Sequence, residues 1–398
     1  MPDTAWVALT ETGVAGRSWT RIDGIDLLRG LSIFFVLMNH VNMRLLLARV
    51  PYTKGLPPQL TSSLVWNGQY GVQIFFAVSG YLITSTSMRR WSFPDKVSAK
   101  EFYTLRFARI APLMLLLLVV LLTLHIVGAQ GYVVSQKVGG LWHAVLAALT
   151  FRINVLEATR GYLPGNWDIL WSLSVEEMFY LFFPLAALLS KRTRFLVPVL
   201  LAFVIAGPFA RAIAFNPNPV WREYSYMGGM DAIAMGCLTA IALGSTKLSK
   251  RWIAVCAALG SGLLIFILCF SIKANARGLG RNGLDMSVLA VGTCLVIATA
   301  AQSGWRSPRV LGPLLALGQL SYEIYLTHMF VVLGLFAVFV RAGKPMRGVP
   351  LLFAAVIVCA GVVGWILARL YAEPMNLWLR KRDSDGPTKL GVAVEEAS

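Results

Sequence analysis

Long apolar runs, separated by short polar segments, follow one another along almost the whole chain. A membrane-spanning helix needs about 20 largely apolar residues. Ten runs are near or above this length: 24–47, 69–88, 108–128, 169–190, 195–214, 226–244, 252–272, 286–302, 313–340 and 349–371. A shorter run, 141–156, contains His143 and Arg152, and the sequence leaves open whether it crosses the membrane, re-enters it or lies at its surface. The pattern predicts an all-α, polytopic membrane protein with about ten transmembrane helices.

The composition supports this fold class. Of the 398 residues, 57% are hydrophobic and 14% are charged, whereas soluble domains have about 45–50% apolar and about 25% charged residues. This balance argues against a soluble enzyme and a disordered chain. The runs are apolar throughout, unlike the alternating strands of a membrane β-barrel. The five cysteines stand singly within apolar runs, as expected of packing residues.

The basic residues indicate an orientation. The formal net charge is +17, but the basic residues are not interleaved with aromatic ones, so we expect no nucleic-acid partner. With ten spans, Lys and Arg are more frequent on the side of the N-terminus, which places both termini in the cytoplasm. We therefore expect a multi-pass protein of the cell (inner) membrane with three parts. These are a cytoplasmic N-terminal segment (1–20), a transmembrane domain (21–380) and a disordered cytoplasmic tail (381–398).

The first span contains three ionisable residues, Asp26, Arg29 and His40. Such residues are costly inside a membrane and are usually paired or functional. Arg29 and His40 are eleven positions apart, which places them on one helix face about 16 Å from each other. Asp26 precedes Arg29 by three positions and can pair with it. The set is explained either by a salt bridge with a buried, hydrogen-bonded histidine or by a row of binding and catalytic groups.

Two further segments place charged residues at the mouths of spans. Arg106 and Arg109 lie one helical turn apart, a spacing that suits either phosphate recognition or a positive anchor on the cytoplasmic side. Glu176 and Tyr180 share a helix face near the outer side, where His40 is also expected. Glu176 is followed by a second carboxylate, Glu177, and an adjacent pair of acids is unusual for simple anchoring.

Polar residues also occur within later spans. The segment from Ser321 to His328, which includes Tyr325, falls in the middle of the run 313–340. It is either an aromatic packing stripe with one satisfied histidine or part of a site. Asp231 is a further buried acid with no assigned partner.

Six segments follow one another along the chain: Asp26-Leu-Leu-Arg29-Gly30 with His40, Gly71 to Tyr81 with Ser79-Gly80, Arg106-Phe-Ala-Arg109, Trp171-Ser-Leu-Ser-Val-Glu176-Glu177-Met-Phe-Tyr180, Ser321 to His328, and Glu373-Pro374. Taken in order, these segments resemble the successive motifs of the acyltransferase 3 family. The resemblance covers residues 22–380, almost the whole chain. Two departures, Thr327 where an aromatic residue is usual and Met178 where Gln is common, affect acceptor fit rather than chemistry.

The resemblance implies a membrane O-acyltransferase, in particular an O-acetyltransferase. Such an enzyme moves an acyl group from acyl-CoA to a hydroxyl of a cell-surface or exported saccharide. Acyl-CoA, as acetyl-CoA, is then a co-substrate, and we expect neither a permanently bound cofactor nor a metal. The expected partners are the donor, the hydroxyl acceptor and the lipid bilayer.

These roles can be assigned to residues as hypotheses. His40 is the general base or an acyl-carrying nucleophile, since an ordinary imidazole titrates near pH 6.5. Glu176 orients His40 or binds the acceptor, and Ser79 donates to the thioester oxygen or serves as a small helix contact. The CoA phosphates are bound by Arg29, Arg106 and Arg109. Structural or orienting roles fall to Asp26, Tyr180, Tyr325 and His328.

Other functions are compatible with ten spans and buried charges. Within the same family, the acceptor can be a small molecule such as a macrolide. A secondary transporter of a glycan precursor is the alternative from another class, although the chain shows no two-half repeat and no matching Gly/Pro-broken helices. A non-catalytic scaffold is a third reading, and it predicts that His40 is dispensable.

Overall fold

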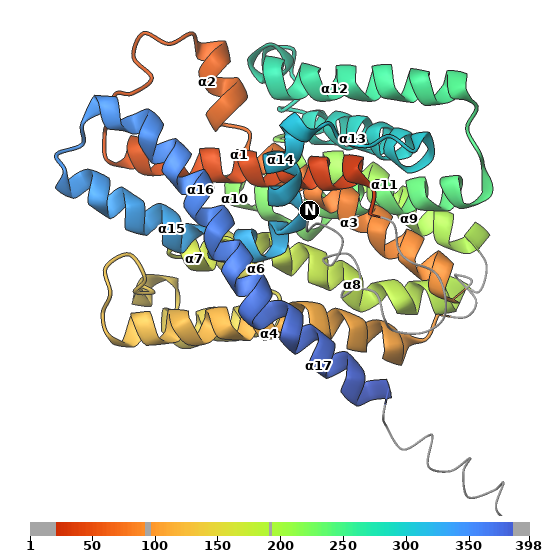
Figure 1. The fold of residues 1–398 in the computed structure, drawn as a ribbon, viewed down its shortest axis with the longest axis horizontal. Coiled ribbons are helices and arrows are strands. Elements are labelled where there is room, and N and C mark those ends of the chain that lie inside the picture. The colour runs from red at the N-terminus through yellow and green to blue at the C-terminus, as the bar shows by residue number, and fades with distance from the viewer. Residues whose placement is uncertain (1–20, 92–96, 191–192, 385–398) are drawn as a thin grey trace, which may run out of the picture.

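The computed structural model describes residues 21–91, 97–190 and 193–384, and within these ranges all regular structure is helical. The expected N-terminal segment 1–20 lies outside them. In Figure 1, α12 and α13 lie along one side of the molecule and α4 along the opposite side, with a long helix through α16 and α17 crossing the view diagonally. An all-helical chain is what the apolar pattern predicts.

Ten helices of at least 19 residues occur in the described ranges, one on each predicted run. They are α1 (Asp23–Leu47), α3 (Gly68–Trp91), α4 (Ala99–Ile126), α8 (Leu170–Ser190), α9 (Thr193–Arg211), α11 (Tyr226–Ser245), α12 (Lys250–Ala276), α13 (Leu284–Ser303), α15 (Ser321–Arg341) and α16 (Val349–Leu367).

Shorter elements connect or extend these helices. They are α2 (Pro58–Val65), α5 (Gly140–Leu149), α6 (Ile153–Arg160), α7 (Gly165–Asp168), α10 (Pro219–Tyr224), α14 (Gly312–Gln319), α17 (Glu373–Ser384), the 3-10 turns η1 (Gln136–Val138), η2 (Arg309–Leu311) and η3 (Met346–Gly348), and the π-turn η4 (Ala368–Ala372). The helix α17 continues past residue 380, where the tail was expected to begin. Residues 385–398 lie outside the described ranges, so the disordered tail stays a prediction.

Eight segments of the described chain are long and apolar enough to cross a membrane. They are Asp23–Leu47, Ala99–Ile126, Gly165–Ala187, Pro219–Ser245, Lys250–Ala276, Leu284–Ser303, Ser321–Arg341 and Met346–Lys381. The two remaining predicted spans are also helical, in α3 and α9. Glutamine, serine and threonine are frequent in α3, which lowers its hydropathy. The protein is therefore a polytopic, all-helical membrane protein.

The structure corrects one predicted span and resolves a second segment. The run 313–340 is not one helix, because the chain turns at Leu320 and divides it into α14 and α15. The segment that ends at His328 therefore opens α15 instead of lying in the middle of a helix. The run 141–156 forms two short helices, α5 and α6, separated near Phe151, whose φ is +54°. Neither is among the eight membrane-length segments.

Close helix crossings position the interior. Gly80 lies directly against the carbonyl of Ile233, and Gly236 lies against that of Ala77, so α3 and α11 meet backbone to backbone. Any side chain at either glycine would separate the two helices. In the same way, Gly318 of α14 lies against the backbone of Asp26 in α1. This contact holds the turn from which α15 starts.

The π-turn between α16 and α17 has a local cause. Pro374 has no N–H and cannot bond the carbonyl four residues earlier, so the regular helical pattern is interrupted before it. Beside it, Arg369 and Glu373 form an ion pair of 3.2 Å. The Glu373-Pro374 motif therefore marks a wide turn in a continuous helix.

Two ends of the bundle are named below. The near end is the one at which α1 begins, at Asp23, and there Arg306 pairs with Asp23 at 3.2 Å. The far end is the one at which α1 ends, at Leu47, where the Lys344 ammonium donates to the Ala48 carbonyl at 3.4 Å. Under the predicted orientation, the near end is cytoplasmic.

Candidate functional site

The three arginines predicted to bind the donor lie towards the near end, each beside a carboxylate or an aromatic ring. Arg29 and Asp26 form the predicted ion pair, with 3.6 Å between the guanidinium and the carboxylate. Arg109 pairs at 3.2 Å with Glu323, a fully buried residue of α15. The charges of Arg109 and Glu323 also act on Arg29, so these residues of α1, α4 and α15 lie close together. The arrangement is a half-exposed, basic surface with two acidic partners.

Arg106 leads from this surface into a polar network. Its guanidinium lies over the ring of Tyr180, 3.9 Å from the ring centre, which is a cation–π contact. The hydroxyls of Ser79 and Tyr180 both donate to the same oxygen of Glu176, and the two hydroxyls also contact each other. The predicted pairing of Glu176 with Tyr180 along one helix face is therefore present. Because the Ser79 hydroxyl bonds to Glu176, its proton is already engaged.

The second carboxylate, Glu177, is also buried, and its Oε1 atom lacks a hydrogen-bond partner among the described residues. It belongs to the same turn of α8 as Glu176. Arg106 and Glu176 both act on it electrostatically. The network thus contains one carboxylate oxygen with two donors, Oε1 of Glu176, and one with none among the described residues, Oε1 of Glu177.

The two histidines predicted from different motifs face each other. The ring centres of His40 on α1 and His328 on α15 are 5.0 Å apart. His328 is fully buried, and its Nδ1 lies 2.6 Å from the Tyr325 carbonyl. Its Nε2 has no partner among the described residues. His40 is half-buried and faces the bundle interior instead of lipid.

Tyr325 connects the histidines to α8. Its hydroxyl lies 2.6 Å from that of Ser172 and donates to the Ile169 carbonyl at 3.0 Å. Ser172 precedes Glu176 by about one helical turn, so α8 contacts the histidine side through Ser172 and carries the Glu176 network one turn later. Glu176 bonds to Ser79 and Tyr180, and the described contacts do not join it to His40.

A polar group beyond the histidines was not singled out from the sequence. Arg44 follows His40 by one turn of α1, and it lies against Gly165 at the start of α7. Its charge interacts with Asp168, which accepts a bond of 3.1 Å from the Tyr224 hydroxyl. The signal was available, because Arg44 continues the face shared by Arg29 and His40. The face therefore carries basic residues on both sides of His40.

Buried polar atoms surround this group. Asn166 and Trp167 of α7 are completely buried, and both amide atoms of Asn166 and the indole nitrogen of Trp167 lack partners among the described residues. Glu157 on α6 is also buried, and one of its oxygens accepts from the Leu163 backbone N–H at 2.9 Å. Burial raises the pKa of Glu157 well above its usual value, and the negative charge of Asp168 raises it further. Burial thus favours the neutral form of Glu157.

Asp231, for which the sequence offered no partner, is paired with Arg211. The two form a bidentate ion pair, with distances of 2.9 and 2.7 Å, and both are buried. Gln73 and Ser287 also donate to the Asp231 carboxylate, at 3.0 and 2.9 Å. The Gly228 and Gly283 carbonyls accept the remaining donors of Arg211. Because every polar group in it is hydrogen-bonded, this network has a structural role and holds its helices together.

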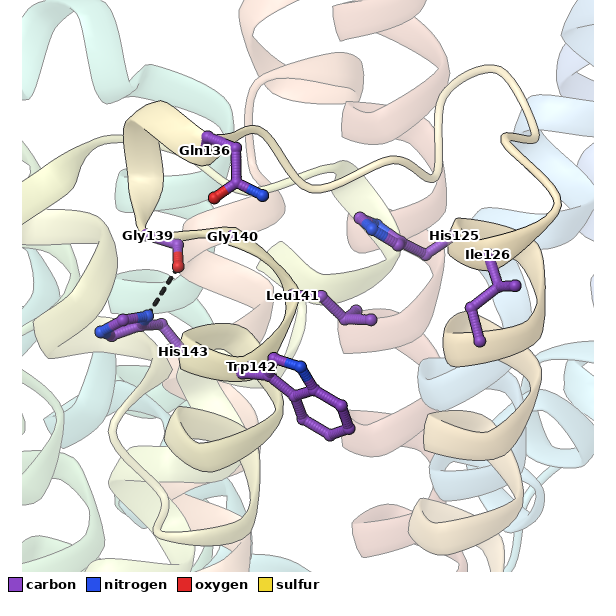
Figure 2. A pocket seen from close by; sticks show the side chains of 8 residues that line it. All are labelled: His125, Ile126, Gln136, Gly139, Gly140, Leu141, Trp142 and His143. Carbon is purple, nitrogen blue, oxygen red and sulfur yellow. Dashed lines mark hydrogen bonds between the residues drawn. The ribbon is translucent and has the colours of Figure 1, made fainter.

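Figure 2 shows a pocket of about 590 Å³ at the far end, between the end of α4 and the start of α5. Its wall includes Trp142 and His143, and the His143 ring bonds to the Gly139 carbonyl at 2.6 Å. None of the predicted site residues line it. The pocket therefore lies apart from both the histidine pair and the arginines.

The fold and these motifs define a polytopic membrane protein with an acyltransferase domain, and comparison with known proteins supports this class. A family model described as an acyltransferase domain matches residues 22–369. The chain belongs to the acyltransferase 3 family.

The chain is also similar to the O-acetyltransferase OatA of Staphylococcus aureus strain NCTC 8325, with 24% identity over 348 residues. This match covers 82% of the chain and 53% of OatA. A putative O-acetyltransferase of Staphylococcus aureus strain COL is 22% identical over 334 residues, which covers 78% of the chain and 50% of that protein. The chain thus spans about half the length of the curated relatives it matches. No solved structure matches the chain.

Proposed function

We propose that this protein is a membrane O-acetyltransferase that transfers an acetyl group from acetyl-CoA to a hydroxyl of a cell-surface or exported saccharide. The family and the similarity to O-acetyltransferases support transfer of an acetyl group. The observation that carries the proposal is the position of His40. It faces His328 inside the bundle, on the same helix face as Arg29 but about 16 Å further along.

The donor is proposed to bind at the near end. Arg29, Arg106 and Arg109 are half-buried guanidinium groups that can bind the anionic phosphates of CoA. The flexible pantetheine arm then extends along α1, past Ser79 and Glu176, and brings the thioester to His40. Glu323 partly neutralises Arg109 in the free protein, so a phosphate competes with this carboxylate.

The acceptor is proposed to reach His40 from the far end. One His40 nitrogen takes the proton of the acceptor hydroxyl while the oxygen attacks the thioester carbonyl carbon. The C–S bond then breaks, and the departing thiolate takes the proton from His40. The products are the O-acetyl ester and free CoA, and His40 returns to its starting state. Attack by His40 itself, with an acetyl-histidine intermediate, gives the same products.

The experiment follows labelled acetyl from acetyl-CoA into the polymer and organic-soluble fractions of membranes that contain the protein. We expect His40→Ala to lower transfer by about 100-fold or more, because it removes the general base. Arg106→Ala is expected to raise the KM for acetyl-CoA. Arg309→Ala, an exposed arginine of the near end, is the matched control and should leave both parameters unchanged.

Each alternative function predicts a different result. If the protein is a transporter or a scaffold, the wild-type protein itself transfers no acetyl group. A scaffold also keeps its function in the variant His40→Ala. If wild-type membranes transfer no acetyl, or if His40→Ala retains full transfer, the proposal is wrong. A macrolide-type acceptor is distinguished by extraction, because its acetylated product is a small organic-soluble molecule, whereas a saccharide product remains in the polymer fraction.

A further inference from the structure

The starting point is the protonation pattern of His328. Its Nδ1 lies 2.6 Å from the Tyr325 carbonyl oxygen. A carbonyl only accepts hydrogen bonds, so Nδ1 must carry the proton and donate it. In a neutral ring, Nε2 then has no hydrogen and presents a lone pair. The backbone of α15 therefore fixes the tautomer of His328.

This lone pair has no hydrogen-bond partner among the residues that the structure describes. Nε2 of His328 is completely buried and is not hydrogen-bonded within the described ranges. Leaving such an atom unpaired destabilises the fold, so an unpaired atom of this kind requires an explanation. The histidines of α4 and α5 differ, because His125 accepts the Val134 N–H at 2.9 Å and His143 is exposed to solvent.

The neighbouring ring of His40 is the partner that the geometry offers. The two ring centres are 5.0 Å apart, with the planes tilted by 46°. Two imidazoles that share an N–H···N bond of about 2.9 Å have centres roughly 5 Å apart. The side chain of His40 forms no hydrogen bond with the described residues. Its ring can therefore rotate about the Cβ–Cγ bond without breaking one.

We propose that His328 is a positioning residue that acts through His40. Its Nε2 accepts the N–H of His40, and this bond holds the other His40 nitrogen unprotonated and directed at the acceptor hydroxyl. This inference rests on the proposed function and assigns the group that orients its base. Glu176 has no such role, since its bonds go to Ser79 and Tyr180.

The proposed hydrogen-bonded series runs from His40 to His328 and from there to the Tyr325 carbonyl. When His40 takes the acceptor proton, positive charge develops on its ring, and the lone pair of His328 stabilises it through the shared N–H. No proton has to leave His40 by this route, because the departing CoA thiolate collects it. A neutral imidazole here performs the task that a carboxylate performs in serine hydrolases, which is to fix the tautomer and orientation of the base.

The first test measures kcat and KM separately, as release of CoA thiol from acetyl-CoA by membranes that contain their own acceptor. His328→Leu removes the acceptor atom and is expected to lower kcat by about 100-fold, with the KM for acetyl-CoA changed less than about twofold. His328→Gln restores a side-chain acceptor and should recover at least about tenfold of this loss. Met329→Leu, a buried neighbour on α15, is the packing control and should behave as wild type.

A second measurement is independent of activity. In detergent-solubilised protein labelled with ¹⁵N-histidine, NMR should show His328 as the Nδ1–H tautomer, and its Nε2 resonance should shift in the variant His40→Gln. If His328→Leu keeps the wild-type kcat, or if Nε2 of His328 carries the proton, the inference is overturned. If wild-type membranes release no CoA, the proposed function fails, and this NMR result still decides whether the two rings are bonded.

Discussion

Two regions of this protein bury charged groups within the bundle, and they treat them in opposite ways. Around Arg211 and Asp231, every donor and acceptor has a partner, and both residues are at most 7% exposed. Around His40, the side chains of Arg29, Arg106 and Glu176 are half-buried, and atoms of Glu177 and His328 have no partner in the described part of the chain. The first region is complete without a ligand, whereas the second contains groups still able to bind one.

This difference distinguishes two reasons why a charged residue can occur inside a membrane. Both regions satisfy the expectation that such residues are paired or functional. A saturated pair stabilises the fold by avoiding an uncompensated charge. A partly unsatisfied set lowers stability and is retained where binding or catalysis requires it. The two regions should therefore respond differently to substitution.

The largest effect is expected in the saturated region. Arg211→Leu leaves the Asp231 carboxylate buried without its cation, which costs about 3–5 kcal/mol. Thermal unfolding in detergent, followed by size-exclusion chromatography, should show a markedly lower midpoint and poor yield. The double variant Arg211→Leu/Asp231→Leu should recover most of the loss, since no charge remains. Arg106→Leu in the other region should change the midpoint little, and an equal loss there would abolish the distinction drawn above.

An intermediate effect is expected where a site arginine already has a partner. Glu323→Gln removes the negative charge beside Arg109, and we expect the KM for acetyl-CoA to fall by roughly threefold to fivefold, as for a partly exposed ion pair of about 1 kcal/mol. Arg109→Gln should raise the same KM. Both shifts should shrink at high salt, because CoA phosphates and the guanidinium interact through screened charges. A KM that rises in both variants would mean that Glu323 only holds Arg109 in place.

The smallest effect is expected at Glu157, a buried acid that is intermediate between the two regions in how far its polar atoms are hydrogen-bonded. Its folded pKa is raised above the unfolded value near 4.5, so the folded protein holds a proton that the unfolded chain releases. This contribution is fully present below the unfolded pKa and is lost as pH rises through the folded pKa. The melting temperature of the wild type should decline by roughly 2–4 °C more than that of Glu157→Gln between about pH 5 and pH 8. Parallel curves would show that Glu157 is ionised in the folded protein.

Much of the fold was predictable because its signals are local. Each long apolar run contains one long helix, and the pairings of Asp26 with Arg29 and of Glu176 with Tyr180 follow from helical spacing. The break at Leu320 was missed, because an apolar pattern cannot show that Gly318 lies against α1. Long-range partners were equally hidden: nothing in the local pattern around Asp231 indicates Arg211, and helical periodicity does not place His328 beside His40.

The crossing of α3 and α11 has a consequence for motion. Ser79 is next to Gly80, which lies against the Ile233 backbone with no side chain between them. Two helices in such contact cannot slide past each other without a steric clash, so the Ser79 hydroxyl travels with α11 as one rigid unit. The helix α1 is held against α3 in the same way, because Gly71 lies against the Ser32 carbonyl. Any widening that admits a thioester is therefore expected on the side of α4 and α15. The helices α3 and α11 are therefore the fixed side of the donor passage during any such motion.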